Sequence, residues 1–466
     1  MQYISTRGEA PPVTFVEAVL TGLAPDGGLY VPANWPQLTP GEIAAFAGRP
    51  YAEVAAVILA RFVGEAIPRA AIEEMCADAY ASFSHTAVVP LAQLTPGRFL
   101  LELFHGPTLA FKDVAMQLLA RLYEHLLARE GRTLTIVCAT SGDTGGAAVE
   151  AFRGRSNVKI VAMFPDGERI SAVQRRFMTT ADEANVACLA VDGTFDDCQA
   201  ILKSLFQDTQ FAHAVDLSGV NSINWARIAA QIVYYFTAAV ALGAPHRPVA
   251  FCAPTGNFGD AYAGYVASRM GLPIERIIAA VNANDILARA LATGRYARGE
   301  VRATSSPAMD IQAASNFERL YFECVGRAPV ETARAFEAFA GNGAIDIPPK
   351  ALASMRALMA GATVSEAETA RTILSTLNET GELVDPHTAV GLTAAARIGP
   401  ANPTTPVIAL ATAHPAKFPE AVAAAAGVKP SAPHSVFRLA GRPERMERIT
   451  ADVGAAKAFI RDFATA

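Results

Sequence analysis

Cysteine is scarce in this chain. The 466 residues include six cysteines, which form no CxxC pair and no cluster with histidine: Cys76, Cys138, Cys188, Cys198, Cys252 and Cys324. This spacing fits neither a disulfide framework nor a zinc site. We therefore predict no metal site, and we expect most of these side chains to be buried as small apolar groups.

Charge is also low, because only 18% of the residues are charged and the formal net charge is −5. Such a chain has no large basic surface with which to neutralise a phosphate backbone, which argues against nucleic acid as a partner. Hydrophobic residues make up 52% of the sequence, which excludes intrinsic disorder and predicts a globular protein.

Long uninterrupted hydrophobic runs are missing as well. The longest, from Ile228 to Ala244, contains Gln231 and is shorter than the ~18 apolar residues of a membrane span, so we interpret it as a buried core helix. No membrane partner is predicted. The N-terminal sequence MQYISTRGEAPP has no charged segment followed by an apolar one, so we expect no cleaved signal and a cytoplasmic location.

The length predicts about two to four domains. Residues 1–90 open with a loop-rich segment and then show helical periodicity over Glu42–Ala47, Tyr51–Phe62 and Ala70–Ser82, which predicts a helical N-terminal domain. Residues 91–380 are expected to form the core, with a smaller subdomain at about 115–240. Residues 330–380 are helical and alanine-rich in pattern. Residues 381–466 are expected to complete the larger part of the core.

From about residue 98, short apolar runs alternate with glycine-rich turns and amphipathic helices, which is typical of βαβ units. Several runs are apolar without alternation, as expected for strands that are covered on both faces. We therefore predict an α/β fold with mostly parallel sheets, whose ligands bind at the carboxyl ends of the strands. The predicted strands are Leu134–Cys138, Lys159–Phe164, Val186–Val191, Val249–Ala253, Ile277–Val281 and Val407–Ala411.

Two of the turns have a composition suited to binding an anion. Residues 139–146 (ATSGDTGG) follow one predicted strand, and residues 254–260 (PTGNFGD) follow another. Free backbone amides at the start of a helix can hold a carboxylate or a phosphate, and glycine lets the ligand come close. Tight packing alone would also select glycine here. Neither turn is a Walker loop or a GxGxxG dinucleotide motif, which weakens a nucleotide-binding interpretation.

A third segment, HGPTLAFKD at residues 105–113, places Lys112 among apolar residues just before the predicted helix Val114–Leu127. Apolar surroundings lower the pKa of an amine, as a Schiff-base or general-base lysine requires. The alternative is a lysine that reaches from the start of the helix into solvent.

Together these three segments resemble pyridoxal-phosphate (PLP) enzymes of fold type II, the tryptophan synthase β-subunit fold, and within it the threonine synthase family. The segments YISTRG at residues 3–8, GLAPDGGLY at 22–30 and TAHPAKF at 412–418 are similar to that family as well. The resemblance extends from residue 3 to about residue 420. It implies a fold type II enzyme with open, mostly parallel twisted sheets, flanking helices and an extra N-terminal domain.

The resemblance also implies residue roles. Lys112 is expected to bind PLP covalently and to move protons, and the amides of residues 256–259 to hold the cofactor phosphate. Thr412 is expected opposite the pyridine nitrogen. A hydroxyl there does not stabilise a protonated pyridinium as a carboxylate would, so the ring is a weaker electron sink. Asp143 replaces the Asn that usually lies near the 3′-oxygen of PLP, which leaves its protonation open. The implied cofactor-binding residues are Phe111, Lys112, Asp143, Gly256, Asn257, Phe258, Gly259, Asp260 and Thr412.

The implied substrate, O-phosphohomoserine, carries a phosphate of its own and needs a second anion site. If a helix begins near Asn221, then Ser222 and its neighbouring amides lie at the positive end of the helix dipole, and Arg227 reaches the phosphate oxygens. An N-cap with a surface arginine is the alternative. The implied substrate-binding residues are Ser141, Gly142, Thr144, Asn221, Ser222, Arg227 and Asn257.

The implied reaction is PLP-dependent γ-elimination of phosphate followed by β-addition of water, which yields L-threonine in the last step of threonine biosynthesis. The alternatives are an O-phosphohomoserine phospho-lyase, a serine/threonine dehydratase-like PLP lyase, and a PLP-binding protein without activity. Residues 294–317 are predicted to form a loop that closes over the site. His387 and His414 are predicted either to lie near the site or to have capping or core roles. No motif indicates whether the chain is a monomer or a dimer.

Overall fold

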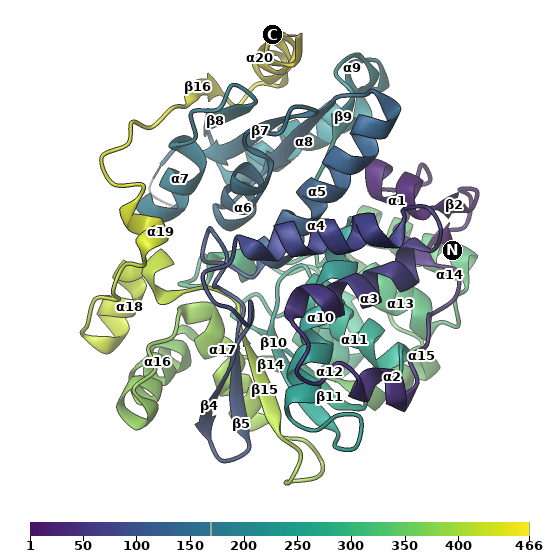
Figure 1. Ribbon diagram of the computed structural model, residues 1–466, viewed down its shortest axis with the longest axis vertical. Coiled ribbons are helices and arrows are strands. Elements are labelled where there is room, and N and C mark those ends of the chain that lie inside the picture. The colour runs from purple at the N-terminus through teal and green to yellow at the C-terminus, as the bar shows by residue number, and fades with distance from the viewer. Residues whose placement is uncertain (168–169, 466) are drawn as a thin grey trace.

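Two sheets of mostly parallel strands form the centre of the protein, one above the other in Figure 1. The computed structural model describes residues 1–167 and 170–465. The larger sheet has six strands in the order β14-β11-β10-β15-β5-β4, and only the β4–β5 pair is antiparallel. These strands are β4 (Leu91–Thr95), β5 (Arg98–Glu102), β10 (Val249–Pro254), β11 (Ile274–Val281), β14 (Met359–Thr363) and β15 (Val407–Ala411).

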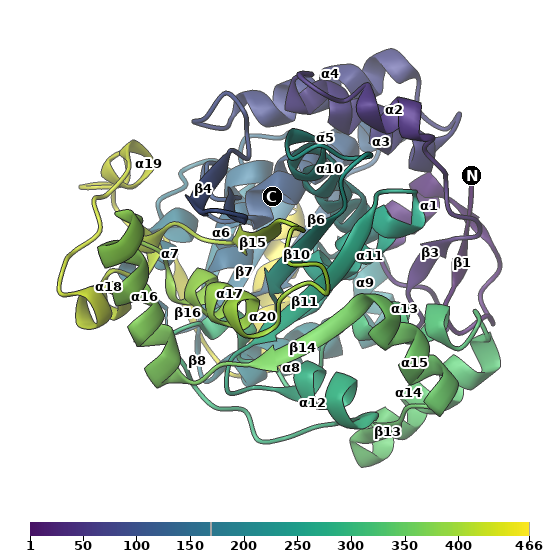
Figure 2. The same ribbon diagram turned by 90° about the horizontal axis from the view of Figure 1, so that it is seen from below.

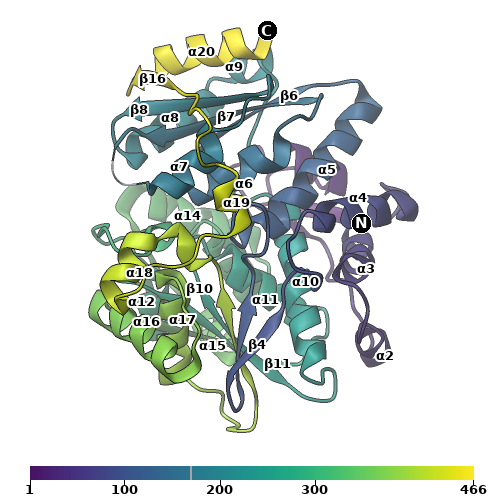
Figure 3. The same cartoon turned by 60° about the vertical axis from the view of Figure 1, so that its left-hand side comes forward.

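The smaller sheet has five strands in the order β16-β8-β7-β6-β9, and every pair is parallel. It occupies the upper part of Figures 1 and 3. Its strands are β6 (Leu134–Ala139), β7 (Val158–Pro165), β8 (Val186–Asp192), β9 (Leu217–Ser218) and β16 (Glu447–Thr450). All six strands predicted from the sequence are present in the two sheets, and β10 and β15 are buried along their whole length because helices cover both faces.

Helices connect the parallel strands and cover the sheets. Two long ones, α5 (Lys112–Glu130) and α10 (Trp225–Ala241), pack against each other. The apolar run around Gln231 is thus the buried core helix expected from the sequence. The helices around the smaller sheet are α6 (Asp143–Phe152), α7 (Ala172–Thr179), α8 (Phe195–Gln207), α9 (Thr209–Ala214) and α20 (Val453–Thr465).

The remaining helices cover the larger sheet, which Figure 2 shows from below. They are α11 (Gly259–Arg269), α12 (Ile286–Thr293), α13 (Phe317–Cys324), α14 (Pro329–Asn342), α15 (Pro349–Leu358), α16 (Glu366–Thr380), α17 (Pro386–Arg397) and α18 (Pro419–Ala426), with the 3-10 turns η1 (Pro307–Met309) and η2 (Pro415–Lys417). The short helix α19 (His434–Phe437) instead lies beside α7 (Figure 3). A two-stranded antiparallel ribbon, β12 (Arg295–Ala297) with β13 (Ala344–Asp346), joins this layer. In the described part of the chain, no helix has the length and apolar character needed to cross a membrane.

The N-terminal region contains α1 (Phe15–Thr21), α2 (Pro40–Ala44), α3 (Tyr51–Val63) and α4 (Arg69–Ala81). It also contains a three-stranded antiparallel sheet, β2-β1-β3, formed by Gln2–Ser5 (β1), Val13–Thr14 (β2) and Tyr30–Pro32 (β3). The prediction of a purely helical domain missed this sheet because its strands are only two to four residues long. The region packs on α10 through Trp225, whose ring lies 5.9 Å from that of Tyr3 and 5.6 Å from that of Phe62.

Two further differences from the sequence predictions have a clear physical cause. Met359–Thr363, in the stretch predicted to be helical, is strand β14, which pairs with β11. Its Gly361 lets α12 come close, since a Cβ there would lie 2.7 Å from the Cα of Ala288. The C-terminal residues are divided between the sheets: β15 belongs to the larger sheet, whereas β16 pairs with β8 and α20 packs on α8. Residues 381–466 therefore do not all complete the larger part.

Candidate active site

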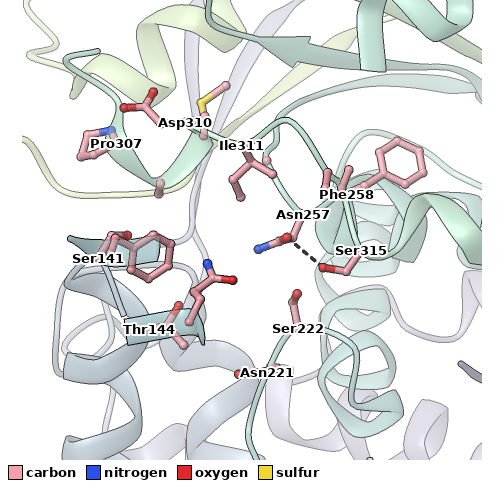
Figure 4. Close-up of a pocket in the computed structure, with 18 of the residues that line it drawn as sticks. Ser141, Thr144, Asn221, Ser222, Asn257, Phe258, Pro307, Asp310, Ile311 and Ser315 are labelled. Atoms are coloured by element: carbon pink, nitrogen blue, oxygen red, sulfur yellow. Dashed lines mark hydrogen bonds between the residues drawn. The ribbon is translucent and has the colours of Figure 1, made fainter. Parts of the chain in front are cut away.

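A cavity of about 1260 Å³ lies where the turns after β6, β10 and β15 meet. Because the carboxyl ends of parallel strands carry these turns, residues far apart in the sequence come together there. Figure 4 shows Ser141 and Thr144 on one side of the cavity and Asn257 and Ser315 on the other. With the exception of Gly142, every residue implied as cofactor- or substrate-binding lines it: Phe111, Lys112, Ser141, Asp143, Thr144, Asn221, Ser222, Arg227, Gly256, Asn257, Phe258, Gly259, Asp260 and Thr412.

Lys112 is the first residue of α5, and the backbone that precedes it is held against the segment after β15. Phe111 N donates to Thr412 O at 2.8 Å, and His414 N donates to Leu109 O at 3.0 Å. Leu109 has a φ of 61°, a left-handed conformation that turns the chain into the helix. These contacts place Lys112 and Thr412 at the same cavity wall.

The Lys112 side chain is 12% exposed, and its amine lies beside a carboxylate that it shares with a second lysine. Its Nζ lies 3.6 Å from Oδ2 of Asp143, and Nζ of Lys417 lies 2.8 Å from Oδ1. Burial lowers the pKa of Lys112, which Asp143 counteracts and Lys417 reinforces. Burial opposes ionisation of Asp143, but the two ammonium groups outweigh it and hold the pKa of this carboxyl far below its usual range. Asp143 is therefore ionised.

The turn at residues 140–144 depends on the conformation of one glycine. Gly142 has a φ of 126°, and a Cβ there would lie 2.8 Å from the side chain of Gln174. The Thr140 hydroxyl accepts from the amides of Gly142 and Gly145, both at 2.9 Å, which closes the turn at the start of α6. Gly142 therefore allows the conformation of the turn but does not line the cavity, whereas Ser141 and Thr144 do line it.

The turn at residues 256–260 has the geometry of an anion cradle. Phe258 caps α11 with a φ of 65°, so the turn presents backbone amides at the N-terminus of that helix. A Cβ at Gly256 would lie 2.7 Å from the carbonyl oxygen of Ala308, so only glycine fits. Asp260 points back into the turn, where its carboxyl accepts from the Thr255 hydroxyl and from the Ala261 amide, and burial raises its pKa.

The segment at residues 221–227 differs from the prediction in one respect. Helix α10 begins at Trp225 with Asn224 as its N-cap, whose side chain accepts from Ala226 N at 3.0 Å. Asn221 and Ser222 therefore lie in the turn before the helix and not at its N-terminus, although both line the cavity. The expected helix start was wrong because the Asn224 side chain supplies the cap.

Arg227 is a buried cation without a carboxylate partner among residues 1–167 and 170–465. It is 3% exposed, its Nη1 donates to Val220 O at 3.0 Å, and its Nε has no hydrogen-bond partner in the described chain. Burial lowers the pKa of this guanidinium to about 10. A buried, unpaired charge at a cavity wall is costly, and an anion in the cavity would compensate it.

Two residues that had no predicted role, Asn316 and Arg319, join the anion-binding turns. The Asn316 side chain donates to Ser222 O at 3.2 Å and to Asn257 O at 3.1 Å. Arg319, fully buried, donates to Asn316 Oδ1, to Ile223 O and, at 3.0 Å, to Tyr30 O of the N-terminal sheet. Asn316 is the N-cap residue of α13 and Arg319 lies in its first turn, and their polar side chains are buried where the local sequence does not indicate burial.

Residues 294–317 line one wall of the cavity, from Tyr296 to Ser315. Their backbone is anchored by Asp310, which accepts from the side chains of Asn282 at 2.8 Å and Asn284 at 3.0 Å. His387 lies at the cavity and its Nε2 is 3.3 Å from Ala308 N. His414 caps η2 through Ala416 N, which is the capping alternative of the sequence analysis.

These groups fit PLP. The cavity contains an amine, that of Lys112, which can react with the aldehyde of PLP. It also contains a glycine-rich helix N-terminus that can bind the PLP phosphate, and the buried Thr412, whose carbonyl accepts from the residue before Lys112. Arg227 adds a second, separate group for an anion. Five of the six cysteines are buried and Cys324 is half-buried, and none of the six lines the cavity.

Comparison with known proteins covers nearly the whole chain. The family models "Threonine synthase N terminus", "Pyridoxal-phosphate dependent enzyme" and "Threonine synthase, C-terminal" match residues 2–80, 83–363 and 388–460. The threonine synthase of Pseudomonas aeruginosa is 47% identical over 461 residues, which cover 99% of this chain and 98% of that protein.

Solved structures agree with this assignment. PLP-bound threonine synthase from Brucella melitensis superposes with a TM-score of 0.97 at 51% identity over 100% of both chains. Threonine synthase from yeast superposes with a TM-score of 0.93 at 37% identity, over 100% of this chain and 99% of that one. This chain is therefore a fold type II, PLP-dependent enzyme and belongs to the threonine synthase family.

Proposed function

We propose that the chain converts O-phospho-L-homoserine and water into L-threonine and phosphate, the last step of threonine biosynthesis. The observation that carries the proposal is the pairing of two anion sites in one cavity. The turn at residues 256–259 suits the cofactor phosphate, and the unpaired Arg227 with Asn221 and Ser222 suits a phosphate on the substrate. Serine or threonine dehydratases act on substrates without a phosphate and would have no use for the second site.

The residues of the first site would hold and orient the cofactor. We assign the cofactor phosphate to the amides of residues 256–259 at the start of α11, where the helix dipole favours an anion. We assign the side of the pyridine nitrogen to the Thr412 hydroxyl. When bound, PLP supplies the electron sink that stabilises the negative charge left on Cα after a proton is removed.

The substrate would be held at both ends. Ser141, Thr144 and the amides at the start of α6 are placed to bind its α-carboxylate. Arg227, Asn221 and Ser222 would bind its phosphate, orient the bond between Cγ and the phosphate oxygen, and stabilise the departing phosphate.

Lys112 is assigned the proton transfers. Its amine lies at the cavity, and its lowered pKa favours the neutral form that can accept the Cα proton. The same amine would return protons later in the reaction. Water has to be excluded until phosphate has left, and we propose that residues 294–317 close over the substrate to do so. Equal protease sensitivity of this loop with and without a phosphonate analogue of the substrate would contradict closure.

The experiment that tests the function is a product assay on PLP-loaded protein supplied with O-phosphohomoserine. Phosphate, threonine and 2-oxobutyrate are measured together. Phosphate matched by threonine is the expected result. Phosphate matched by 2-oxobutyrate would make the chain a phospho-lyase with the same site, because the two reactions differ only after phosphate has left. No release of phosphate would contradict the assignment of Arg227, Asn221 and Ser222. The cytoplasmic location stays a prediction, which cell fractionation would test.

A further inference from the structure

Lys417 takes part in the site although it does not line the cavity. It lies in η2, more than 300 positions after Lys112 in the sequence, and its side chain is 1% exposed. Its Nζ is 2.8 Å from Asp143 Oδ1 and also donates to Thr108 O at 2.8 Å. A buried ammonium is retained only where its contacts repay the loss of water, and both of these contacts lie within a few residues of the catalytic site.

The pair formed by Lys417 and Asp143 is held from a third element as well. Gln174 of α7 donates to Asp143 Oδ1 at 2.9 Å, and Ser171, the N-cap of that helix, donates from its hydroxyl to Lys417 O at 2.9 Å. Asp143 is thus fixed with Oδ1 toward Lys417 and Gln174, while Oδ2 lies 3.6 Å from the Lys112 amine. That distance is longer than a hydrogen bond.

On this geometry, and on the proposed function of Lys112, we propose that Lys417 is a positioning residue: it holds the Asp143 carboxylate away from Lys112 and so keeps the catalytic amine available in its neutral form. Asp143 alone would pair with Lys112 and fix a proton on it. With Lys417 in place, the carboxylate is already neutralised and a second positive charge lies near the amine, so both effects disfavour a proton on Lys112.

Other charged groups face this cluster and belong to the same balance. Arg227 of α10 lowers the pKa of Lys112, and Asp260 of α11 raises it. The charge of Lys417 also lowers the pKa of Asp113, against the larger effect of burial. Burial is the main cause of the lowered pKa of Lys112, and the charges act on it in both directions. Of these groups, only Lys417 both touches the Asp143 carboxylate and adds a positive charge near Lys112.

The test measures the protonation of Lys112 directly in the full-length chain freed of cofactor. The protein is labelled briefly with acetic anhydride at a series of pH values, and the fraction of acetylated Lys112 is read by mass spectrometry. Only the neutral amine reacts, so the midpoint of the profile reports the pKa of Lys112. Neither substrate nor PLP is needed, and a failure of the proposed function in the product assay would leave this measurement unaffected.

We expect Lys417→Met to move the midpoint upward by at least about one pH unit, which is about a tenfold loss of labelling at a fixed pH below it. Asp143→Asn, which keeps the shape of the side chain, should move the midpoint downward. Opposite shifts cannot come from a general loosening of the fold. Lys159→Met is the matched control, because Lys159, near the start of β7, donates from Nζ to the carbonyl oxygens of Phe463 and Ala464 in α20 and contacts none of the residues of this cluster in the described chain, and it should leave the midpoint unchanged.

Two results would overturn the proposal. One is a Lys417→Met profile that coincides with that of the wild type, and the other is a shift of both variants in the same direction. If Lys417→Met does not fold, as judged by its circular dichroism, Lys417→Gln, which also removes the charge, decides: an unchanged or lowered midpoint refutes the role of Lys417, and a raised one supports it.

Discussion

Replacing Arg227 with methionine should stabilise the ligand-free protein and at the same time impair substrate binding. Burial lowers the pKa of this guanidinium to about 10 from its ordinary value of 12.5. At about 1.4 kcal/mol per pH unit, the buried charge destabilises the folded state at neutral pH by about 3 kcal/mol. Loss of the hydrogen bond to Val220 O offsets about 1–2 kcal/mol of this. The free energy of unfolding should therefore rise by about 1–2 kcal/mol.

The same substitution removes the guanidinium that we assign to the substrate phosphate. Two charge-assisted hydrogen bonds contribute about 3 kcal/mol or more, so kcat/KM for O-phosphohomoserine should fall by about 100-fold or more. Urea unfolding of the cofactor-free protein measures the first effect, and steady-state kinetics of the PLP-loaded protein measure the second. If Arg227 is present for binding at the expense of stability, the free energy of unfolding should rise and kcat/KM should fall in the same variant.

Arg319 provides the matched comparison. It is equally buried and its pKa is also lowered to about 10, but it donates to the oxygen atoms of Tyr30, Ile223 and Asn316. Arg319→Met leaves these acceptors unpaired and should destabilise the protein by about 3 kcal/mol or more. If Arg227→Met is also destabilising, or if it leaves kcat/KM intact, then Arg227 is a structural residue and the second anion site is wrongly assigned.

Three other substitutions test separate parts of the site. Lys112→Ala should fold, as measured by circular dichroism, but take up no PLP and release no phosphate; turnover by this variant would rule out the assigned role. Burial raises the pKa of Asp113 from 3.8 to about 6, so this carboxyl binds a proton on folding and its contribution to stability falls as the pH rises from about 4 to 6. In urea unfolding at pH 4 and pH 7, the difference between wild type and Asp113→Asn should change by about 2.4 kcal/mol, and a constant difference would contradict the raised pKa. Gly256→Ala places a Cβ 2.7 Å from Ala308 O and should weaken PLP binding at least about tenfold in a fluorescence titration. Gly399→Ala is the control, because a Cβ there has no atom within 4 Å, and it should leave the affinity unchanged. Equal affinities of the two variants for PLP would show that the turn tolerates a side chain.

Local sequence was sufficient for the elements that have strong local signals. The apolar strands, such as Val249–Pro254, were predicted because burial on both faces leaves a continuous hydrophobic run. The turn at residues 254–260 was predicted because its glycine-rich composition directly follows an apolar run. Weak elements were missed: Met359–Thr363 has little intrinsic preference for a strand, and it became one because β11 offered a partner.

For the site, the chemical groups could be read from local motifs: the amine of Lys112, the two glycine-rich turns and the hydroxyl of Thr412. Their electrostatics depend on the folded arrangement. The ionised state of Asp143 follows from Lys417, and the unpaired state of Arg227 follows from burial at a cavity wall, where described neighbours supply only the carbonyl of Val220. Desolvation and pairing depend on what surrounds a group in space, and for Asp143 a residue more than 200 positions away in the sequence supplies the charge.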